Sequence, residues 1–198
     1  MMNLGNYSVP SETFNGVCVD VGANLGDFTN KYLNHFSKIF YVEPQTNLFN
    51  NIKERFKEHS HVIGFNNAVW YESDINLDLV FHANLDFGSV GVKGDFVNDH
   101  WTDNMVNTVK SLSIEDLFKK INCGVIDYLK IDCETSEFPF LYNKDISKIR
   151  YIGAELHFQL GEKRYNDLLD WIKRTHILIH GDDSYTNNNK EVLYKLKE

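Results

Sequence analysis

Two acidic stretches in the sequence contain the residue types of a catalytic site. "KIDCETSE" contains Asp132 and Glu134, and "AELH" contains Glu155 and His157. Both stretches end apolar, strand-like runs, where charged groups are costly unless they are paired or functional. These groups could accept the proton of a hydroxyl, or together hold a divalent cation. We favour direct acid–base use over a metal, because three acidic groups and one histidine do not fix a coordination geometry.

Structural explanations exist for the same residues. Lys130, the first residue of "KIDCETSE", could form an ion pair with Glu155. His157 could be a hydrogen-bonded histidine at the sheet edge. Glu155 and His157 are two positions apart, so a strand would place both on one face. The sequence therefore predicts a shared acidic edge, with Asp132, Glu134, Glu155 and His157 as catalytic candidates.

A second candidate site is the glycine turn in "VCVDVGANLGDF". Gly22, Asn24 and Gly26 form a G-x-N-x-G pattern, which is not the G-x-G-x-x-G fingerprint of a pyrophosphate site. Glu43 follows the next strand-like run, where a carboxylate can accept hydrogen bonds from ribose hydroxyls and repels phosphate. Asp20, directly before the turn, favours a cationic ligand group. S-adenosylmethionine fits both features, because it has a ribose and a charged amino-acid tail, and is therefore the ligand this turn indicates. The alternative is a purely structural turn that binds no ligand.

The elements that must position these residues alternate along the chain. Apolar runs predict strands at 16–21, 38–44, 61–70, 124–134 and 151–156, and helical periodicity marks 26–36, 47–59, 113–121 and 162–174. In the third of these helices, Ser113 and Asp116 give an N-terminal cap signal. Such alternation predicts an α/β fold, a mostly parallel sheet with helices on both faces.

Two regions depart from this alternation. Residues 176–181 and 191–197 read as strands joined by a loop too short for a crossover helix, so the last pair should be antiparallel. Residues 74–110 read as short strands around turns, which predicts an inserted β-hairpin region. Residues 1–198 together are expected to form a single domain.

Composition limits the classes of function. The chain has 198 residues, 42% hydrophobic and 14% aromatic, with a formal net charge of -8. That charge disfavours a sequence-independent grip on nucleic acid. The three scattered cysteines predict reduced thiols, and no run approaches the length of a membrane span. We expect a cytoplasmic protein without a membrane partner.

Six motifs occur in the order and spacing of one known family. They are "VDVGANLGDFT", "YVEPQTNLFNNI", "NNAVW", "SLSIEDL", "IDYLKIDCETSEFPFL" and "IGAELH". Over roughly residues 17–157, this pattern resembles the FkbM-type methyltransferases, which are class I S-adenosylmethionine-dependent enzymes. One departure is Thr135 with Ser136, where the family commonly has Gly-Ala.

The resemblance implies roles for individual residues. Gly22, Asn24 and Gly26 would cradle the methionine portion of S-adenosylmethionine, and Glu43 would hold its ribose. Asn67 and Ala68 would flank the adenine. Asp20 and Asp132 complete the expected cofactor-binding set.

The implied reaction is O-methylation of a small molecule or glycan. Two alternatives remain open at this point. One is a non-catalytic partner or scaffold module with the same fold, and the other is a nucleic-acid methyltransferase, which the net charge disfavours.

Overall fold

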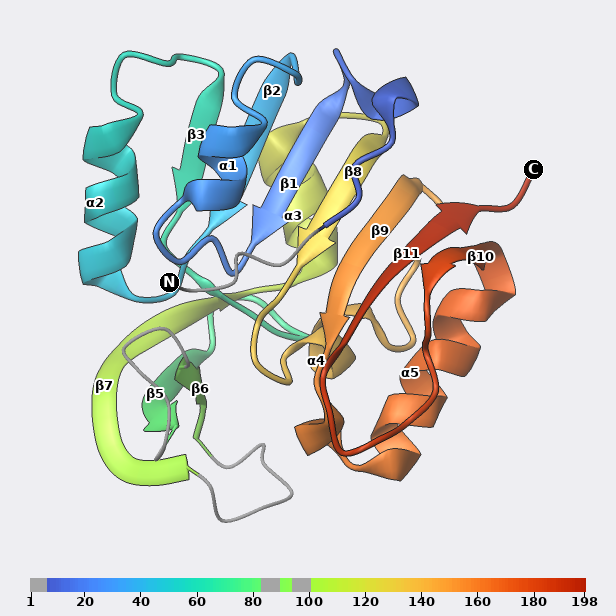
Figure 1. The fold of residues 1–198 in the computed structure, drawn as a ribbon. Helices are drawn as coiled ribbons and strands as arrows, with labels where there is room; N and C mark the ends of the chain where they lie inside the picture. Colours follow the sequence, from blue (N-terminus) through green and yellow to red (C-terminus); the bar gives the residue numbers. More distant parts are fainter. Residues whose placement is uncertain (1–6, 83–89, 94–100) are drawn as a thin grey trace.

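A seven-stranded sheet forms the centre of the protein. The structure, a computed structural model, describes residues 7–82, 90–93 and 101–198. The sheet order is β10-β11-β9-β8-β1-β2-β3 (Figure 1). Its strands are β1 (Val17–Val21), β2 (Lys38–Val42), β3 (Val62–Phe65), β8 (Ile126–Ile131), β9 (Ile149–Leu156), β10 (His176–Gly181) and β11 (Lys190–Leu196).

Strand direction follows the predicted pattern. β3, β2, β1, β8 and β9 are parallel neighbours, so their carboxyl ends meet at one edge. β10 and β11 form the expected antiparallel pair. β11 also pairs antiparallel with β9, and therefore lies inside the sheet while β10 forms its border.

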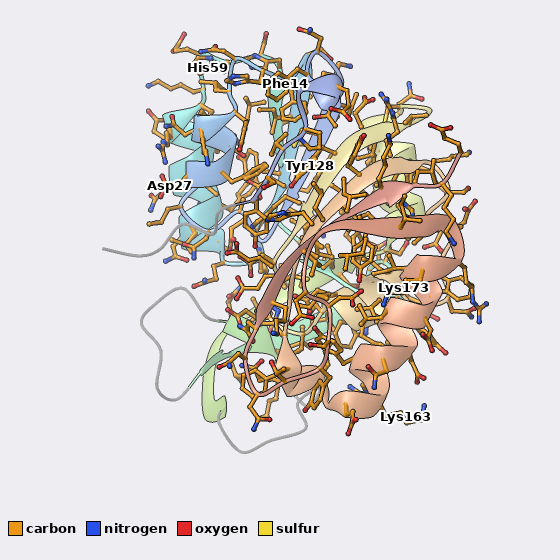
Figure 2. The ribbon with its side chains drawn as sticks, turned by 45° about the vertical axis from the view of Figure 1, so that its right-hand side comes forward. Phe14, Asp27, His59, Tyr128, Lys163 and Lys173 are labelled. Atoms are coloured by element: carbon orange, nitrogen blue, oxygen red, sulfur yellow. The ribbon has the colours of Figure 1, made fainter. Side chains whose placement is uncertain are left out.

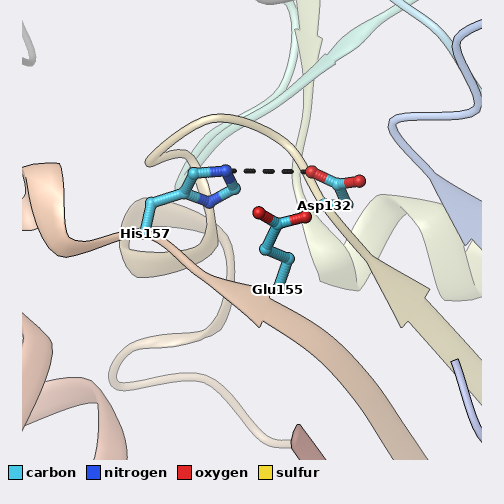
Figure 3. A group of neighbouring side chains, drawn as sticks. All are labelled: Asp132, Glu155 and His157. Carbon is cyan, nitrogen blue, oxygen red and sulfur yellow. Dashed lines mark ion pairs between the residues drawn. The ribbon is translucent and has the colours of Figure 1, made fainter. Parts of the chain in front are cut away.

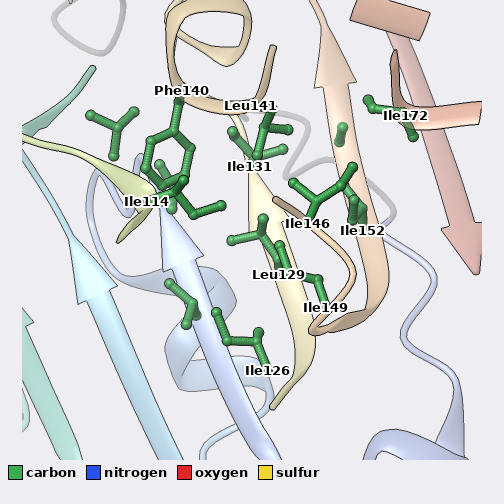
Figure 4. Packing of buried hydrophobic residues seen from close by; sticks show 14 of the residues in the cluster. Ile114, Ile126, Leu129, Ile131, Phe140, Leu141, Ile146, Ile149, Ile152 and Ile172 are labelled. Carbon is green, nitrogen blue, oxygen red and sulfur yellow. The ribbon is translucent and has the colours of Figure 1, made fainter. Parts of the chain in front are cut away.

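Helices cover both faces of this sheet, as expected. On one face lie α3 (Ile114–Ile121), α4 (Glu137–Leu141) and α5 (Glu162–Thr175). Figure 4 shows their packing: Ile114 and Phe140 lie against Leu129 and Ile131 of β8. The alternation along each strand sends these apolar side chains to this face and leaves the intervening ones for the other.

The second face carries α1 (Asp27–Lys31) and α2 (Thr46–Arg55). Tyr128 of β8 lies in the interior in Figure 2, stacked on Phe28 of α1 with ring centroids 6.0 Å apart. By contrast, Lys163 and Lys173 lie on the outer side of α5. Two short 3-10 helices, η1 (Ser11–Thr13) and η2 (Phe158–Leu160), complete the helical elements of the described chain.

The predicted insertion forms most of a second, smaller sheet. It contains β4 (Ala68–Val69), β5 (Asn76–His82), β6 (Val90–Val92) and β7 (Trp101–Leu112), in the order β4-β7-β5-β6. β5 pairs antiparallel with β6 and β7. Figure 1 shows this sheet beyond the carboxyl ends of β1 and β8. Of the expected hairpin region, residues 83–89 and 94–100 lie outside the described residues.

The first predicted helix is shorter than its apolar spacing indicates. The sequence predicts a helix over 26–36, but α1 ends at Lys31 and turns follow. The amide of His35 donates to the carbonyl of Tyr32, three residues back, and the His35 carbonyl accepts from Asn15. Tyr32 and Phe36 nevertheless pack on one apolar cluster, which explains why apolar residues keep a helix-like spacing beyond the end of α1.

The predicted strand at 61–70 is two strands in different sheets. β3 ends at Phe65, and β4 begins at Ala68 in the small sheet. Between them, Asn66 Nδ2 donates to the Glu43 carbonyl at 2.9 Å. Asn67 Nδ2 donates to the Lys110 carbonyl at 3.0 Å. The two side chains thus donate to the backbone after β2 and in β7, one at each neighbouring sheet, a role to which asparagine is suited.

Candidate active site

Asp20 lies inside the protein, where a threonine and a lysine are its partners. Its side chain is fully buried; Oδ2 accepts from Thr29 Oγ1 at 2.8 Å, and Oδ1 is 3.3 Å from Lys130 Nζ. Burial alone lowers the pKa of Lys130, but Asp20 and Asp132 more than compensate, so this pKa is raised. The charge of Asp20 is therefore matched within the chain. The alternative pairing of Lys130 with Glu155 is not the one the structure forms.

The same lysine holds the glycine turn. Lys130 Nζ donates to the carbonyl oxygens of Gly22 at 2.7 Å and Val21 at 3.2 Å. Gly22 has φ +73°, and a Cβ there would lie 1.7 Å from the carbonyl oxygen of Asp132. No L side chain fits at that distance. Gly22 is thus required by the close approach of β1 and the segment after β8.

Glu43 fixes the other side of this turn. The side chain is buried, Oε2 accepts from the Asn24 amide at 2.8 Å, and Oε1 accepts from the Gln45 amide at 2.9 Å. Burial raises the pKa of Glu43 to about 7 in spite of these two N–H donors. Asn24 at φ +52° and Gly26 at φ +76° adopt the left-handed conformation, which lets the backbone turn beside the end of β2.

The two residues expected at the adenine lie where the chain passes between sheets. Asn67 bonds to the Lys110 carbonyl, as described above. Ala68 is buried in β4, opposite Ser111 of β7. They follow β3 at the same edge as the glycine turn.

Asp132, Glu155 and His157 come together as the strand pattern predicts. One oxygen or nitrogen atom from each lies within 4.8 Å of the others, and Figure 3 shows the side chains pointing toward one another. His157 Nε2 is 3.8 Å from Asp132 Oδ1 and 3.4 Å from Glu134 Oε2. Burial and the carboxylate of Asp132 raise the pKa of Glu155. Glu155 also accepts from Asn189 Nδ2 at 2.9 Å, in the loop before β11.

Glu137 is a site residue that sequence reasoning missed. It is fully buried at the start of α4, and its Oε1 lies 2.7 Å from His157 Nδ1 and 3.1 Å from the amide of Cys133. Burial alone lowers the pKa of His157, but Glu137 and Glu134 outweigh it and raise this pKa well above its ordinary value. The available signal was a glutamate directly before the apolar residues of α4, in "EFPFL".

Tyr7 is a second missed residue. It comes from the segment before η1 and is buried, with Lys130 Nζ 5.6 Å from its ring centroid. Burial and the carboxylates of Asp132 and Glu155 raise the pKa of Tyr7. Among the described residues its hydroxyl has no hydrogen-bond partner. Nothing in the polar stretch around it distinguishes this tyrosine in the sequence.

The turn after Asp132 is strained. Glu134 has φ +51° and Thr135 has φ +79°, in the left-handed region that glycine favours. For a β-branched residue this conformation costs about 1–2 kcal/mol. The chain therefore keeps this turn without a glycine at Thr135, the residue type that suits it. The turn brings Glu134 to His157.

Comparisons with known proteins agree with this architecture. The model of the methyltransferase FkbM domain matches residues 20–181. A crystal structure of a methyltransferase FkbM from Methylobacillus flagellatus KT superposes with a TM-score of 0.56 at 14% identity, covering 96% of this chain and 48% of that one. This chain therefore spans about half the length of that relative. No curated protein sequence matches.

Two further structures share the fold and carry the cofactor or its product. A Streptococcus mutans protein, solved in complex with SAH, covers 94% of this chain and 93% of its own, with a TM-score of 0.54 at 9% identity. Aeropyrum pernix fibrillarin with natively bound S-adenosyl-L-methionine aligns over 96% of this chain and 70% of the fibrillarin chain, with a TM-score of 0.54 at 8% identity. Among the described residues, none of the helices combines the length and the hydropathy that a membrane span requires. With its fold that of the class I S-adenosylmethionine-dependent methyltransferases, the chain belongs to the FkbM methyltransferase domain family.

Proposed function

We propose that this chain is an S-adenosylmethionine-dependent methyltransferase that methylates a hydroxyl group of a small molecule or glycan. One observation carries the proposal: the glycine turn, Glu43 and the Asp132–Glu155–His157 group all lie at the carboxyl ends of neighbouring parallel strands. In open α/β sheets, ligands bind at this edge. A cofactor at the turn would thus lie beside the acidic group.

The residues at the turn suit the ribose end of the cofactor. Each oxygen of Glu43 accepts one backbone N–H and keeps acceptor capacity for a ribose hydroxyl. Asn67 and Ala68 follow β3 at the same edge and would flank the adenine. Asp20 has its charge matched by Lys130, so we assign it the task of holding Gly22 in place through that lysine.

The acidic group would act on the acceptor. Bound S-adenosylmethionine would supply a methyl group that moves from sulfur to the acceptor oxygen, leaving S-adenosylhomocysteine and a hydroxyl proton to be removed. Asp132 and Glu155 are only partly buried and can reach that proton. His157 is buried behind them and, held by Glu137, would keep their orientation. Much of the rate of such an in-line displacement comes from holding the reacting atoms in position.

Cofactor binding tests the first half of the proposal. Calorimetry with S-adenosylhomocysteine should give one site per chain, and Glu43→Ala should weaken it by about 1.5–3 kcal/mol, or about 10- to 150-fold, through loss of charge-assisted hydrogen bonds. Glu58→Ala removes an exposed carboxylate from the segment before β3 and should bind as the wild type does. Unchanged affinity in a folded Glu43→Ala protein would contradict the ribose assignment.

A turnover screen tests the second half. The purified chain with labelled methyl donor should transfer label to hydroxyl compounds among sugars and small-molecule alcohols. Label in RNA would instead support a nucleic-acid methyltransferase. Cofactor binding without transfer to any acceptor class would support the non-catalytic module.

A further inference from the structure

We propose that Asp132, Glu155 and His157 bind a divalent cation. This inference rests on the proposed function, because the cation would lie on the acceptor side of the cofactor. Their residue types alone left direct acid–base use and metal binding open. The structure adds the orientation of His157.

The separations suit a single ion. The three potential ligand atoms lie within 4.8 Å of one another, and Nε2 of His157 is 3.8 Å from Oδ1 of Asp132. Ligand atoms bound at 2.0–2.1 Å in an octahedral site lie roughly 3–4 Å apart. Small side-chain rotations would therefore bring all three to one ion.

His157 is held as a ligand. It is 1% exposed, and its Nδ1 lies 2.7 Å from Oε1 of Glu137. Its Nε2 points at the carboxylates, yet no described residue lies within hydrogen-bonding geometry of it. A glutamate on one ring nitrogen and a metal on the other is a common arrangement, since the carboxylate fixes the ring and increases its basicity.

The charges around this nitrogen are mostly negative. Carboxylates of Asp132, Glu134 and Glu155 gather on the Nε2 side of the ring, and Glu137 lies on the other. One buried cation, Lys130, lies 3.7 Å from Oδ2 of Asp132, but it is closer to Asp20, at 3.3 Å, and also donates to backbone carbonyls. A divalent ion would offset this excess of negative charge more fully than one imidazolium.

The site would also have open positions. Asp132 keeps 29% of its side-chain surface exposed, so water or an acceptor oxygen can complete the coordination. A cation there would bind the acceptor hydroxyl and lower its pKa. With Asp132 and Glu155 bound to the cation, the proton would pass to Glu134 in their place, since its Oε2 lies 3.4 Å from Nε2 of His157. Two carboxylates with one imidazole suit a hard to borderline ion such as Mg²⁺ or Mn²⁺.

Mn²⁺ binding to the whole, chelator-treated chain is the test. Electron paramagnetic resonance of free Mn²⁺ should show one saturable site, from which excess Mg²⁺ displaces the ion. Glu155→Gln and Asp132→Asn keep side-chain size and should each weaken binding at least tenfold. Glu137→Gln, which alters only the residue behind His157, should weaken it by about 10- to 100-fold. Glu58→Gln makes the same chemical change away from this edge and should bind Mn²⁺ normally.

Two results would overturn the site. One is the absence of a stoichiometric Mn²⁺ site in the wild type, and the other is equal Mn²⁺ affinity in folded Glu155→Gln and wild type. Either result supports His157 as an imidazolium paired with the carboxylates. S-adenosylhomocysteine binding in the presence of EDTA separates this outcome from the function proposed above: if the product binds and Mn²⁺ does not, only the cation site is wrong.

Discussion

At the scale of single residues, the glycine turn has a structural cause. Gly22 lies against the backbone of Asp132, with a left-handed φ, and Lys130 donates to its carbonyl. A substitution at Gly22 thus disturbs the contact between β1 and the segment after β8 whether or not a ligand binds there. Loss of cofactor binding in such a variant would not identify the turn as a binding site.

The stability of a Gly22→Ala variant tests this explanation. The new Cβ would meet a backbone oxygen at 1.7 Å, so the free energy of unfolding should fall by at least about 2 kcal/mol, measured by urea titration. Gly124→Ala is the matched control, because a Cβ there meets no atom within 4 Å, and should change the same quantity by less than about 0.5 kcal/mol. Equal stability of the two variants would show that the close approach to Asp132 is wrong.

At the scale of elements, the end of β2 is fastened to its neighbours by one carboxylate. Glu43 accepts amides from the turn after β1 and from the start of α2, so a single side chain sets the mouth of the proposed ribose site. Lys130 from β8 and Asp20 from β1 are the charged groups that act on it. With a pKa of about 7, Glu43 changes charge near neutral pH.

Cofactor-product affinity should therefore depend on pH. Ionised Glu43 accepts ribose hydrogen bonds better than the acid, so S-adenosylhomocysteine affinity should rise by up to about tenfold from pH 6 to 8. Calorimetry on Glu43→Gln, which shares every other titrating group including the ligand amine, should lose this increase. If the two proteins show the same pH profile, Glu43 is not the titrating ribose acceptor.

Ionisation of Glu43 also changes the free energy of unfolding, which it lowers as the pH rises, whereas it raises the affinity for the cofactor product. Its pKa is about 7 in the folded protein and 4.5 at the ordinary value, so the folded state binds more protons between these pH values. The contribution of Glu43 to the free energy of unfolding is thus fully present below about pH 4.5. It is lost as pH rises through 7.

At the scale of the whole molecule, the last strand lies within the central sheet. β11 is bonded on one side to β9 and on the other to β10. Val192 and Tyr194 are buried on one face, and Leu193 is buried on the other. β10 has β11 as its neighbour in the sheet order, so it depends on this strand for its backbone pairing.

Deleting residues 190–198 should therefore abolish cooperative folding. The loss would leave the edges of β9 and β10 unpaired and would expose apolar surface on both faces. Thermal unfolding followed by circular dichroism should show no single transition for this protein, whereas deletion of Glu198 alone should keep the wild-type midpoint. A cooperative transition at the wild-type temperature in the longer deletion would contradict the position of β11.

Local patterns in the sequence determined the elements and the edge at which polar groups gather. Period-two and helical spacing located the strands and main helices, and the predicted cap of α3 is present, with Ser113 accepting from the Asp116 amide at 3.3 Å. The Asp132, Glu155 and His157 grouping also followed, because carboxyl ends of parallel strands must meet. These features depend on neighbours in sequence or on rules common to all parallel sheets.

Partner choice among charged groups was decided by tertiary structure alone. Only the register of β1 against β8 sets Lys130 opposite Asp20, and only the turn after β8 brings Glu137 to His157. The break after β3 and the position of β11 between β9 and β10 likewise depend on contacts with distant segments. One sequence pattern is compatible with several such pairings, and packing in three dimensions selects among them by which charges it buries together.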